Sequence, residues 1–191
     1  MNQYQMPIVL VDMDGPLADF DAEVLSRLRT KYPDMTLLST RKHFYISDDY
    51  PQHSQLVRSI SDEQGFFESL PLAADALYGW QRIIDLGYHP RICSAPMKSN
   101  PFSMTEKINW LKREFVPIFG KYVVEEAIIS SDKHLHDGIV LIDDRSELIG
   151  SKQATWKHIV FDAEYNHDSK QPRLYGWSDK NLPNLLKSAN K

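Results

Sequence analysis

The feature that most constrains the fold is the segment 8–15, in which four apolar residues run directly into Asp-Met-Asp-Gly. Three of the four apolar residues are β-branched, which is typical of a strand buried on both faces of a parallel sheet. Gly15 permits a sharp turn after this strand. Asp12 and Asp14 therefore stand at the carboxyl end of a strand, where open α/β sheets bind their ligands. Taken alone, the motif is also compatible with an ordinary Asp-Gly turn.

Four more runs of the chain predict strands, over residues 89–94, 127–130, 139–142 and 158–161. Apolar residues at helical spacing separate them over residues 71–86 and 101–115 and, more weakly, over 145–153. Alternating strands and helices are typical of an α/β fold with right-handed crossovers. We therefore predict a doubly wound, Rossmann-like parallel sheet.

The connection between the first two predicted strands is too long for a single crossover. It spans about 75 residues, whereas a crossover needs about a dozen. Residues 17–31 and 52–60 have helical spacing, and residues 33–50 are irregular and rich in aromatic side chains. We predict that residues 17–70 form a small, mostly helical cap inserted after the first strand. Residues 1–16 and 71–191 then form the Rossmann-like catalytic core, with the polar tail after His167 at its periphery.

The composition excludes several classes of protein. With 22 Lys and Arg against 26 Asp and Glu, the net charge of −4 does not favour binding to a nucleic acid polymer. No apolar run approaches the length of a transmembrane helix, and residues 1–5 lack the features of a signal peptide. The single cysteine, Cys93, lies in an apolar run and is expected to be buried. We expect a soluble, cytoplasmic protein without a membrane partner.

Each of the first four predicted strands leads into polar or charged residues. Because the carboxyl ends of parallel strands share one edge of the sheet, these side chains should converge in one crevice. Carboxylates clustered without His or Cys suit Mg²⁺ and a substrate phosphate, while an ammonium and a hydroxyl can bind phosphoryl oxygens. A carboxylate that faces both cations can attack phosphorus. The converging residues are Asp12 and Asp14, then Ser94, then Lys133, then Asp143 and Asp144.

The same motifs resemble those of a known superfamily. DxDG, a strand-end Ser, a Lys and a strand-end IDD, in this order, are similar to the four motifs of the haloacid dehalogenase superfamily, whose core is a Rossmann-like sheet. Segments 12–20, 65–68, 92–98, 132–133 and 141–145 resemble in addition the 5′(3′)-deoxyribonucleotidases. The resemblance covers about residues 8–145, most of the chain. It implies a Mg²⁺-dependent phosphomonoesterase that hydrolyses nucleoside monophosphates through an aspartyl-phosphate.

The resemblance also implies a role for each matching residue. Asp12 would be the nucleophile, and Asp14 would protonate the leaving oxygen and later activate water. Mg²⁺ would be held by Asp12, the backbone carbonyl of Asp14 and the carboxylate of Asp144. Asp143 would support this set from behind, although Asp143 and Asp144 could exchange roles. Ser94 and Lys133 would bind the phosphate, with Lys98 as a further contact.

The cap would choose the substrate. Phe20, Phe44 and Tyr45 match positions where these nucleotidases hold the base, and stacking on an aromatic ring tolerates any base. The same aromatic residues could instead form the cap's own core. The expected partner is a small nucleotide, and the chain itself is expected to be a monomer or a homodimer.

Three other functions are compatible with parts of this pattern. A phosphatase of the same superfamily could act on another small phosphoester with the same residues. A phospho-receiver signalling domain also uses Asp, Lys and Mg²⁺, but its phosphoacceptor follows the third strand, where this chain has Ser130 and Ser131. A catalytically inactive binding module is disfavoured because Asp12 and Asp14 are both present. A metal site at His134 and His136 is disfavoured because two imidazoles are too few.

Overall fold

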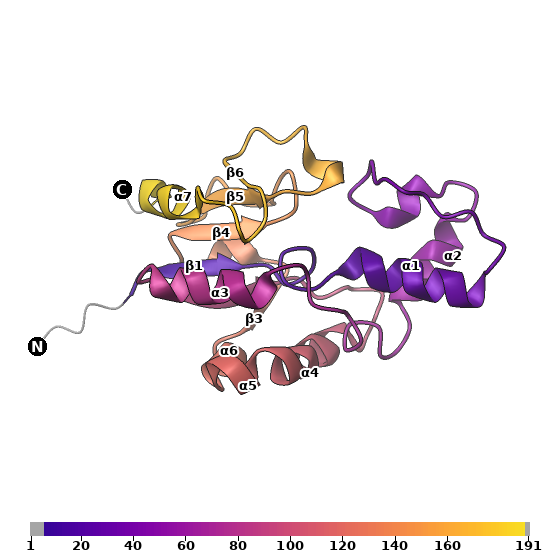
Figure 1. Ribbon diagram of the computed structural model, residues 1–191, viewed down its shortest axis with the longest axis horizontal. Coiled ribbons are helices and arrows are strands. Elements are labelled where there is room, and N and C mark those ends of the chain that lie inside the picture. The colour runs from indigo at the N-terminus through magenta and orange to yellow at the C-terminus, as the bar shows by residue number, and fades with distance from the viewer. Residues whose placement is uncertain (1–5, 190–191) are drawn as a thin grey trace, which may run out of the picture.

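The computed structural model describes residues 6–189, so the prediction for residues 1–5 lies outside the described part (Figure 1). Six strands form one sheet in the order β3-β2-β1-β4-β5-β6, and every neighbouring pair is parallel. This is the strand order of a doubly wound Rossmann fold, so the predicted fold class is confirmed. The strands are β1 (Ile8–Val11), β2 (His89–Ser94), β3 (Ile128–Ile129), β4 (Val140–Asp143), β5 (Lys157–Phe161) and β6 (Arg173–Leu174).

Alternation along β1 divides the apolar core between the two faces of the sheet. Val9 and Val11 belong to the large cluster, which also contains Trp80 and Trp110 from the helices. Leu10 belongs to a small cluster on the other side of the strand. The helices of this part of the chain are α3 (Ala76–Asp85), α4 (Ser103–Glu114), α5 (Val116–Phe119), α6 (Tyr122–Glu125) and α7 (Leu182–Ala189), with the 3₁₀ turns η2 (Lys133–Leu135) and η3 (Glu164–Asn166).

The insertion after β1 is mostly helical, as predicted, and contains α1 (Phe20–Lys31), η1 (Ile46–Asp49) and α2 (Ser54–Ser61). Figure 1 shows α1 and α2 side by side, beyond the end of the sheet. Helix α1 begins at Phe20 and not at the predicted residue 17, because Asp19 caps it by accepting a hydrogen bond from the Ala22 backbone N–H at 2.9 Å. The exact boundaries of the cap stay a prediction.

Two connecting strips, one around Ala18 and one around Leu72, join the cap to the sheet and run antiparallel to each other. Ala18 and Leu72 form an antiparallel bridge, and the Asp19 backbone N–H donates to the Pro71 carbonyl at 2.8 Å. This pairing occupies the residues predicted to start the helix at 71, so α3 begins only at Ala76. The two strips therefore fix where the cap stands above the strand ends.

The predicted helix over residues 145–153 is wrong. The structure has turns there, and Ile149, an apolar residue of the expected helix, is 90% exposed. Gly150 has φ +74°, and a Cβ at this position would lie 2.4 Å from the His134 ring. The backbone therefore leaves helical geometry where it passes His134.

The C-terminal tail is also more integrated than predicted. β6 extends the sheet, and Trp177 is buried, with its indole N–H donating to the Pro16 carbonyl at 2.6 Å. A Cβ on Gly79 of α3 would lie 2.1 Å from Trp177, so the indole fills a groove that only glycine leaves open. Trp177 is thus a packing anchor for the turn that follows β1. Within the described residues, no helix is long and apolar enough to cross a membrane.

Candidate active site

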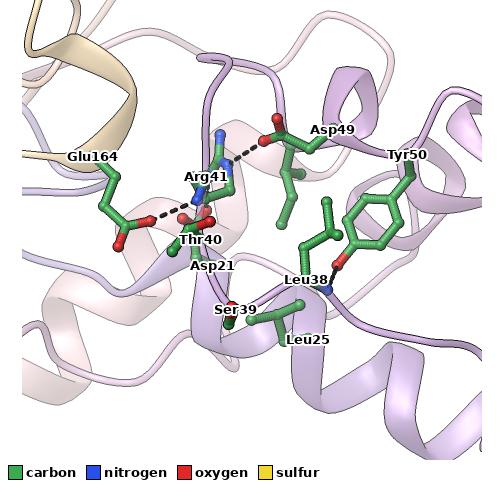
Figure 2. Close-up of a pocket in the computed structure, with 10 residues that line it drawn as sticks. Asp21, Leu25, Leu38, Ser39, Thr40, Arg41, Asp49, Tyr50 and Glu164 are labelled. Atoms are coloured by element: carbon green, nitrogen blue, oxygen red, sulfur yellow. Dashed lines mark hydrogen bonds and ion pairs between the residues drawn. The ribbon is translucent and has the colours of Figure 1, made fainter.

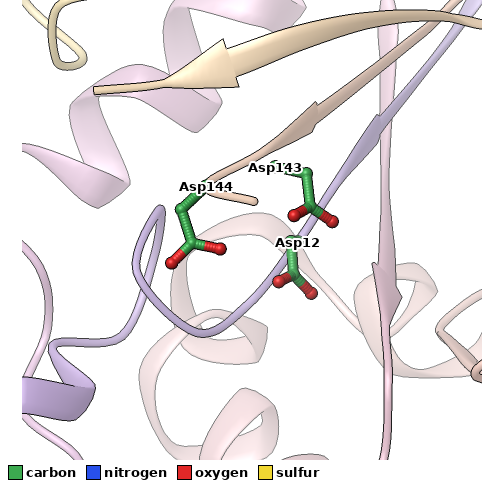
Figure 3. A group of neighbouring side chains, drawn as sticks. All are labelled: Asp12, Asp143 and Asp144. Atoms are coloured by element: carbon green, nitrogen blue, oxygen red, sulfur yellow. The ribbon is translucent and has the colours of Figure 1, made fainter. Parts of the chain in front are cut away.

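Three aspartates converge where β1 and β4 end (Figure 3). Asp12 follows β1, Asp143 is the last residue of β4, and Asp144 follows it; carboxylate oxygens of all three lie within 4.8 Å of one another. All three side chains are buried. Like charges at this distance repel strongly in a buried site, so the cluster calls for compensating cations.

Lys133 supplies part of that compensation. Its Nζ lies 2.9 Å from Asp12 Oδ1 and 2.5 Å from Asp143 Oδ2. Burial alone would lower the pKa of Lys133, but the two carboxylates outweigh burial and raise it. Burial also disfavours the charged form of Asp12 and so raises its pKa. The Lys133 and Lys107 ammonium groups outweigh this effect and bring the pKa below its usual range. Asp12 is therefore an ionised carboxylate, which is the state a nucleophile needs.

Asp143 and Asp144 have different surroundings, which separates their roles. Asp143 uses both oxygens within the protein, accepting from Lys133 Nζ and, at 3.0 Å, from the Arg145 backbone N–H. Asp144 accepts from the Tyr165 hydroxyl through Oδ2. Burial raises the pKa of Asp144 well above its usual range, and the Asp143 and Asp12 charges add to the effect. Asp144 therefore has the stronger need for a cation.

The donor set fits a divalent, oxygen-binding cation. The site contains four aspartates and two lysines, so two negative charges stay uncompensated if every aspartate is ionised. Asp12 Oδ1 is buried and lacks an aligned hydrogen bond, despite its closeness to Lys133. Carboxylates without His or Cys favour Mg²⁺ over Zn²⁺. The residues in question are Asp12, Asp14, Asp143 and Asp144, with Lys107 and Lys133 as the cations.

Gly15 is the residue that lets the turn after β1 approach this cluster. It has φ +85°, and a Cβ there would lie 2.5 Å from Asp144 Oδ2. Glycine is therefore required at this position, both because φ is positive and because the Asp144 carboxylate lies where a side chain would be.

Lys107 also lies at this site, although no sequence motif indicates it. It lies on α4 and is fully buried, and its Nζ donates to Asp14 Oδ2 at 2.6 Å and to Ser94 Oγ at 2.8 Å. Its spacing from Trp110 and Leu111 places it on the buried face of the helix. A lysine on the apolar stripe of a predicted helix was the available signal. Tyr165, in η3, gave no such signal, because only the folded chain brings it to Asp144.

A cleft of about 1130 Å³ opens from these aspartates towards the cap. The structure places Ser94 and Lys133 on its wall, and Lys98 lies exposed on the loop after β2 at the same cleft. This volume is slightly above the usual range for small-molecule sites, about 300–1,000 Å³. The roles of all three residues in phosphate binding stay predictions.

The three aromatic residues predicted for base binding all line this cleft, but they differ in freedom. Phe20 packs edge-on against Phe66, with ring centroids 5.1 Å apart. The Arg145 guanidinium covers the Phe44 ring at 4.3 Å. Tyr45 is 57% exposed. Phe20 and Phe44 thus both pack within the protein and border the cleft, so the two interpretations of these rings are compatible.

A smaller hollow of about 160 Å³ lies in the cap beside the cleft (Figure 2). Arg41 stands at its centre, paired with Asp21 and Asp49, and its backbone N–H donates to Glu164 Oε2. The Arg41 guanidinium also lies 4.5 Å from the centre of the Tyr165 ring. Arg41 therefore ties the cap to η3, the segment that carries the hydroxyl bound to Asp144.

The other candidates from the sequence lie outside this chemistry. The pKa of Cys93 is raised to about 12, chiefly by burial, so the thiol is not a nucleophile. His134 packs against Gly150, and among the described residues the one cluster of potential metal ligands excludes both His134 and His136.

Comparison with known proteins points to one family. A family profile described as "5′ nucleotidase, deoxy (Pyrimidine), cytosolic type C protein" matches residues 6–188. The human mitochondrial 5′(3′)-deoxyribonucleotidase is 34% identical over 185 residues, which cover 90% of this chain and 78% of that protein. The human cytosolic type is 33% identical, covering 90% and 89%.

Solved structures show the fold independently of close sequence similarity. A HAD-hydrolase from Bacillus subtilis, bound to magnesium, has a TM-score of 0.58 at 13% identity and covers 95% of this chain and 99% of its own. An L-2-haloacid dehalogenase from Xanthobacter autotrophicus has a TM-score of 0.54 at 9% identity, with 96% and 99% covered.

Proposed function

Because the chain belongs to the 5′(3′)-deoxyribonucleotidase family of HAD phosphatases, we propose that it hydrolyses deoxyribonucleoside 5′- and 3′-monophosphates to the nucleoside and inorganic phosphate. The observation that carries the proposal is the convergence of an ionised Asp12, a second acid Asp14 and a charged Lys133 at the floor of a capped cleft. The family supports the nucleotide, and the cleft's aromatic border supports a base.

In the first step, an oxygen of Asp12 attacks phosphorus, and the bond from phosphorus to the ester oxygen breaks. Asp14 gives its proton to that oxygen, so the nucleoside leaves as a neutral alcohol. Burial raises the pKa of Asp14, with Lys107 opposing it and the Asp12 charge adding to it, which favours a protonated acid. Lys133 and Ser94 stabilise the charge on the phosphoryl oxygens.

In the second step, Asp14 removes a proton from a water molecule while the water oxygen attacks the phosphorus of the aspartyl-phosphate. The Asp12 oxygen leaves as a carboxylate, and phosphate is released. Asp14 is then protonated again, and both aspartates have returned to their starting states. Asp12 and Asp14 are two residues apart along the turn, which supports attack and proton transfer at the same phosphate group.

Asp12, the backbone carbonyl of Asp14 and the Asp144 carboxylate would hold Mg²⁺, with Asp143 keeping Lys133 in place. When bound, the ion supplies positive charge for the phosphoryl oxygens and for the crowded carboxylates. The buried lone cysteine supports a cytoplasmic location. A monomer or homodimer stays a prediction.

A hydrolysis panel tests the proposed function. We expect Mg²⁺-dependent phosphate release from dUMP and dTMP, with kcat/KM at least about tenfold above that for ribose 5-phosphate or glucose 6-phosphate, because the cap adds base contacts worth about 1–3 kcal/mol. Phosphate release with and without EDTA measures both effects. Equal rates on sugar phosphates would replace this proposal with a phosphatase for another small phosphoester.

Removing the Tyr165 hydroxyl should weaken metal binding. In Tyr165→Phe, Asp144 loses the donor that orients it, and we expect the Kd for Mg²⁺ to rise by about tenfold, as when other partners of ligating groups are removed. Titration calorimetry with Mg²⁺ alone measures this without turnover. Tyr175→Phe is the matched control, since Tyr175 is 69% exposed, and its Kd should equal that of the wild type. An unchanged Kd in Tyr165→Phe would contradict the assignment of Asp144 as a ligand.

A further inference from the structure

One charged group at the site has no part in the mechanism above. The Lys107 ammonium is fully buried and donates hydrogen bonds to Asp14 at 2.6 Å and to Ser94 at 2.8 Å. Asp14 and Ser94 border the cleft, and Lys107 does not. Lys107 therefore lies behind the two side chains and reaches the substrate only through them.

We propose that Lys107 is a positioning residue for proton transfer, one that holds the Asp14 carboxyl so that a single oxygen faces the ester. The proposal rests on the proposed function, since it concerns the step in which Asp14 protonates the leaving oxygen. This positioning role requires a charged donor on the side of Asp14 that faces away from the cleft, and Lys107 of α4 is such a donor.

The two oxygens of Asp14 have different surroundings. Oδ2 accepts from Lys107, whereas Oδ1 is buried without a hydrogen-bond partner among the described residues. An unpartnered buried carboxyl oxygen is costly unless something else binds it. Oδ1 is therefore the oxygen left for the leaving group and, in the second step, for the attacking water.

The same ammonium orients Ser94. A lysine ammonium has three donors and no acceptor, so Ser94 Oγ must accept the hydrogen bond. The Ser94 hydroxyl proton is then turned away from Lys107, on the side where Asp12 or a phosphoryl oxygen can accept it. One buried lysine thereby sets the direction of two side chains that face the substrate.

The neighbouring residue on α4 connects this arrangement to the cap. Glu106 is buried and accepts from the backbone N–H groups of Gly65 at 2.6 Å and Phe67 at 3.0 Å, in the strip that returns from the cap. The Lys107 ammonium lies 5.1 Å from the centre of the Phe67 ring. The same turn of α4 thus holds the cap strip and the proton-transfer acid, which keeps their separation constant.

The test is the dependence of the rate on the leaving group. A nucleoside alkoxide needs a proton to leave, whereas p-nitrophenolate leaves without one. In Lys107→Met, we expect the pre-steady-state rate of nucleoside release from dUMP to fall by about 100-fold, within the range for loss of general acid catalysis, and the rate of the p-nitrophenolate burst from p-nitrophenyl phosphate to fall less than fivefold. KM for dUMP and KM for p-nitrophenyl phosphate should change by the same factor, because Ser94 faces the phosphate that both substrates share. Lys112→Met, an exposed lysine of the same helix, should match the wild type on both substrates.

Two further variants keep the proposal falsifiable. Lys107→Gln retains N–H donors without the charge, so the ratio of its two rates should lie between those of the wild type and Lys107→Met. This variant replaces Lys107→Met if the latter does not fold. Asp14→Asn should show the same selective loss as Lys107→Met. Equal losses on both substrates, or no loss, in folded Lys107 variants would overturn the positioning role. If Asp14→Asn itself shows no selectivity, the proposed mechanism fails and not only the role of Lys107.

Discussion

Asp12→Asn should reduce phosphate release from dUMP by at least about 10⁴-fold, because a neutral amide cannot attack phosphorus. The fold should persist, since Lys133 keeps its ion pair with Asp143 when the Asp12 charge is removed. Steady-state phosphate release at saturating Mg²⁺, with thermal unfolding of the same preparation, measures both quantities.

Asp132→Asn is the control for this substitution. Asp132 is an exposed aspartate directly before Lys133, so its variant loses the same charge near the site and should keep the wild-type rate. Trapping with beryllium fluoride adds a second readout, with the adduct expected on Asp12 in the wild type and absent in Asp12→Asn. Activity of Asp12→Asn near the wild-type value, or an adduct on another residue, would refute the nucleophile.

Gly15→Ala should have the second largest effect, a loss of at least about 100-fold in kcat, the scale of a small displacement in a catalytic site. The new Cβ would lie 2.5 Å from Asp144 Oδ2, so the turn or the carboxylate must move. The positive φ of +85° adds a backbone cost of about 1–2 kcal/mol to the folded state. Phosphate release and denaturant unfolding separate the loss of activity from the loss of stability.

Gly87→Ala is the matched control. Gly87 has φ +83°, but a Cβ there would meet nothing within 4 Å, so this variant should lose stability by a similar amount and keep its activity. If Gly15→Ala were as active as Gly87→Ala, the close approach of the turn to Asp144 would have no catalytic importance.

The strand ends were predictable because their signal is local. β1 and β4 are apolar runs followed at once by acids, and in a parallel sheet the position of a strand end determines its neighbours. Asp12, Asp143 and Asp144 therefore meet as the sequence indicates. The helix predicted over residues 145–153 is wrong because the spacing of its apolar residues does not correspond to burial, as the exposed side chain of Ile149 shows.

The difference between Asp143 and Asp144 was not predictable. The two residues are adjacent and chemically identical, and what separates them is a lysine ten residues away and a tyrosine twenty-one residues away. The mixed role of Phe44 also follows from packing, since Arg145 covers one side of a ring that could otherwise stack freely.

The sequence by itself determined the sheet, the cap inserted after its first strand and the cluster of carboxylates, because periodicity and strand-end residues are encoded within short segments. Only the tertiary structure decided how these carboxylates are oriented and charged. Lys107 is 93 residues from Asp14 along the chain and yet in contact with it. Burial makes each such contact strong, since a charge removed from water depends on the few partners that the fold brings to it.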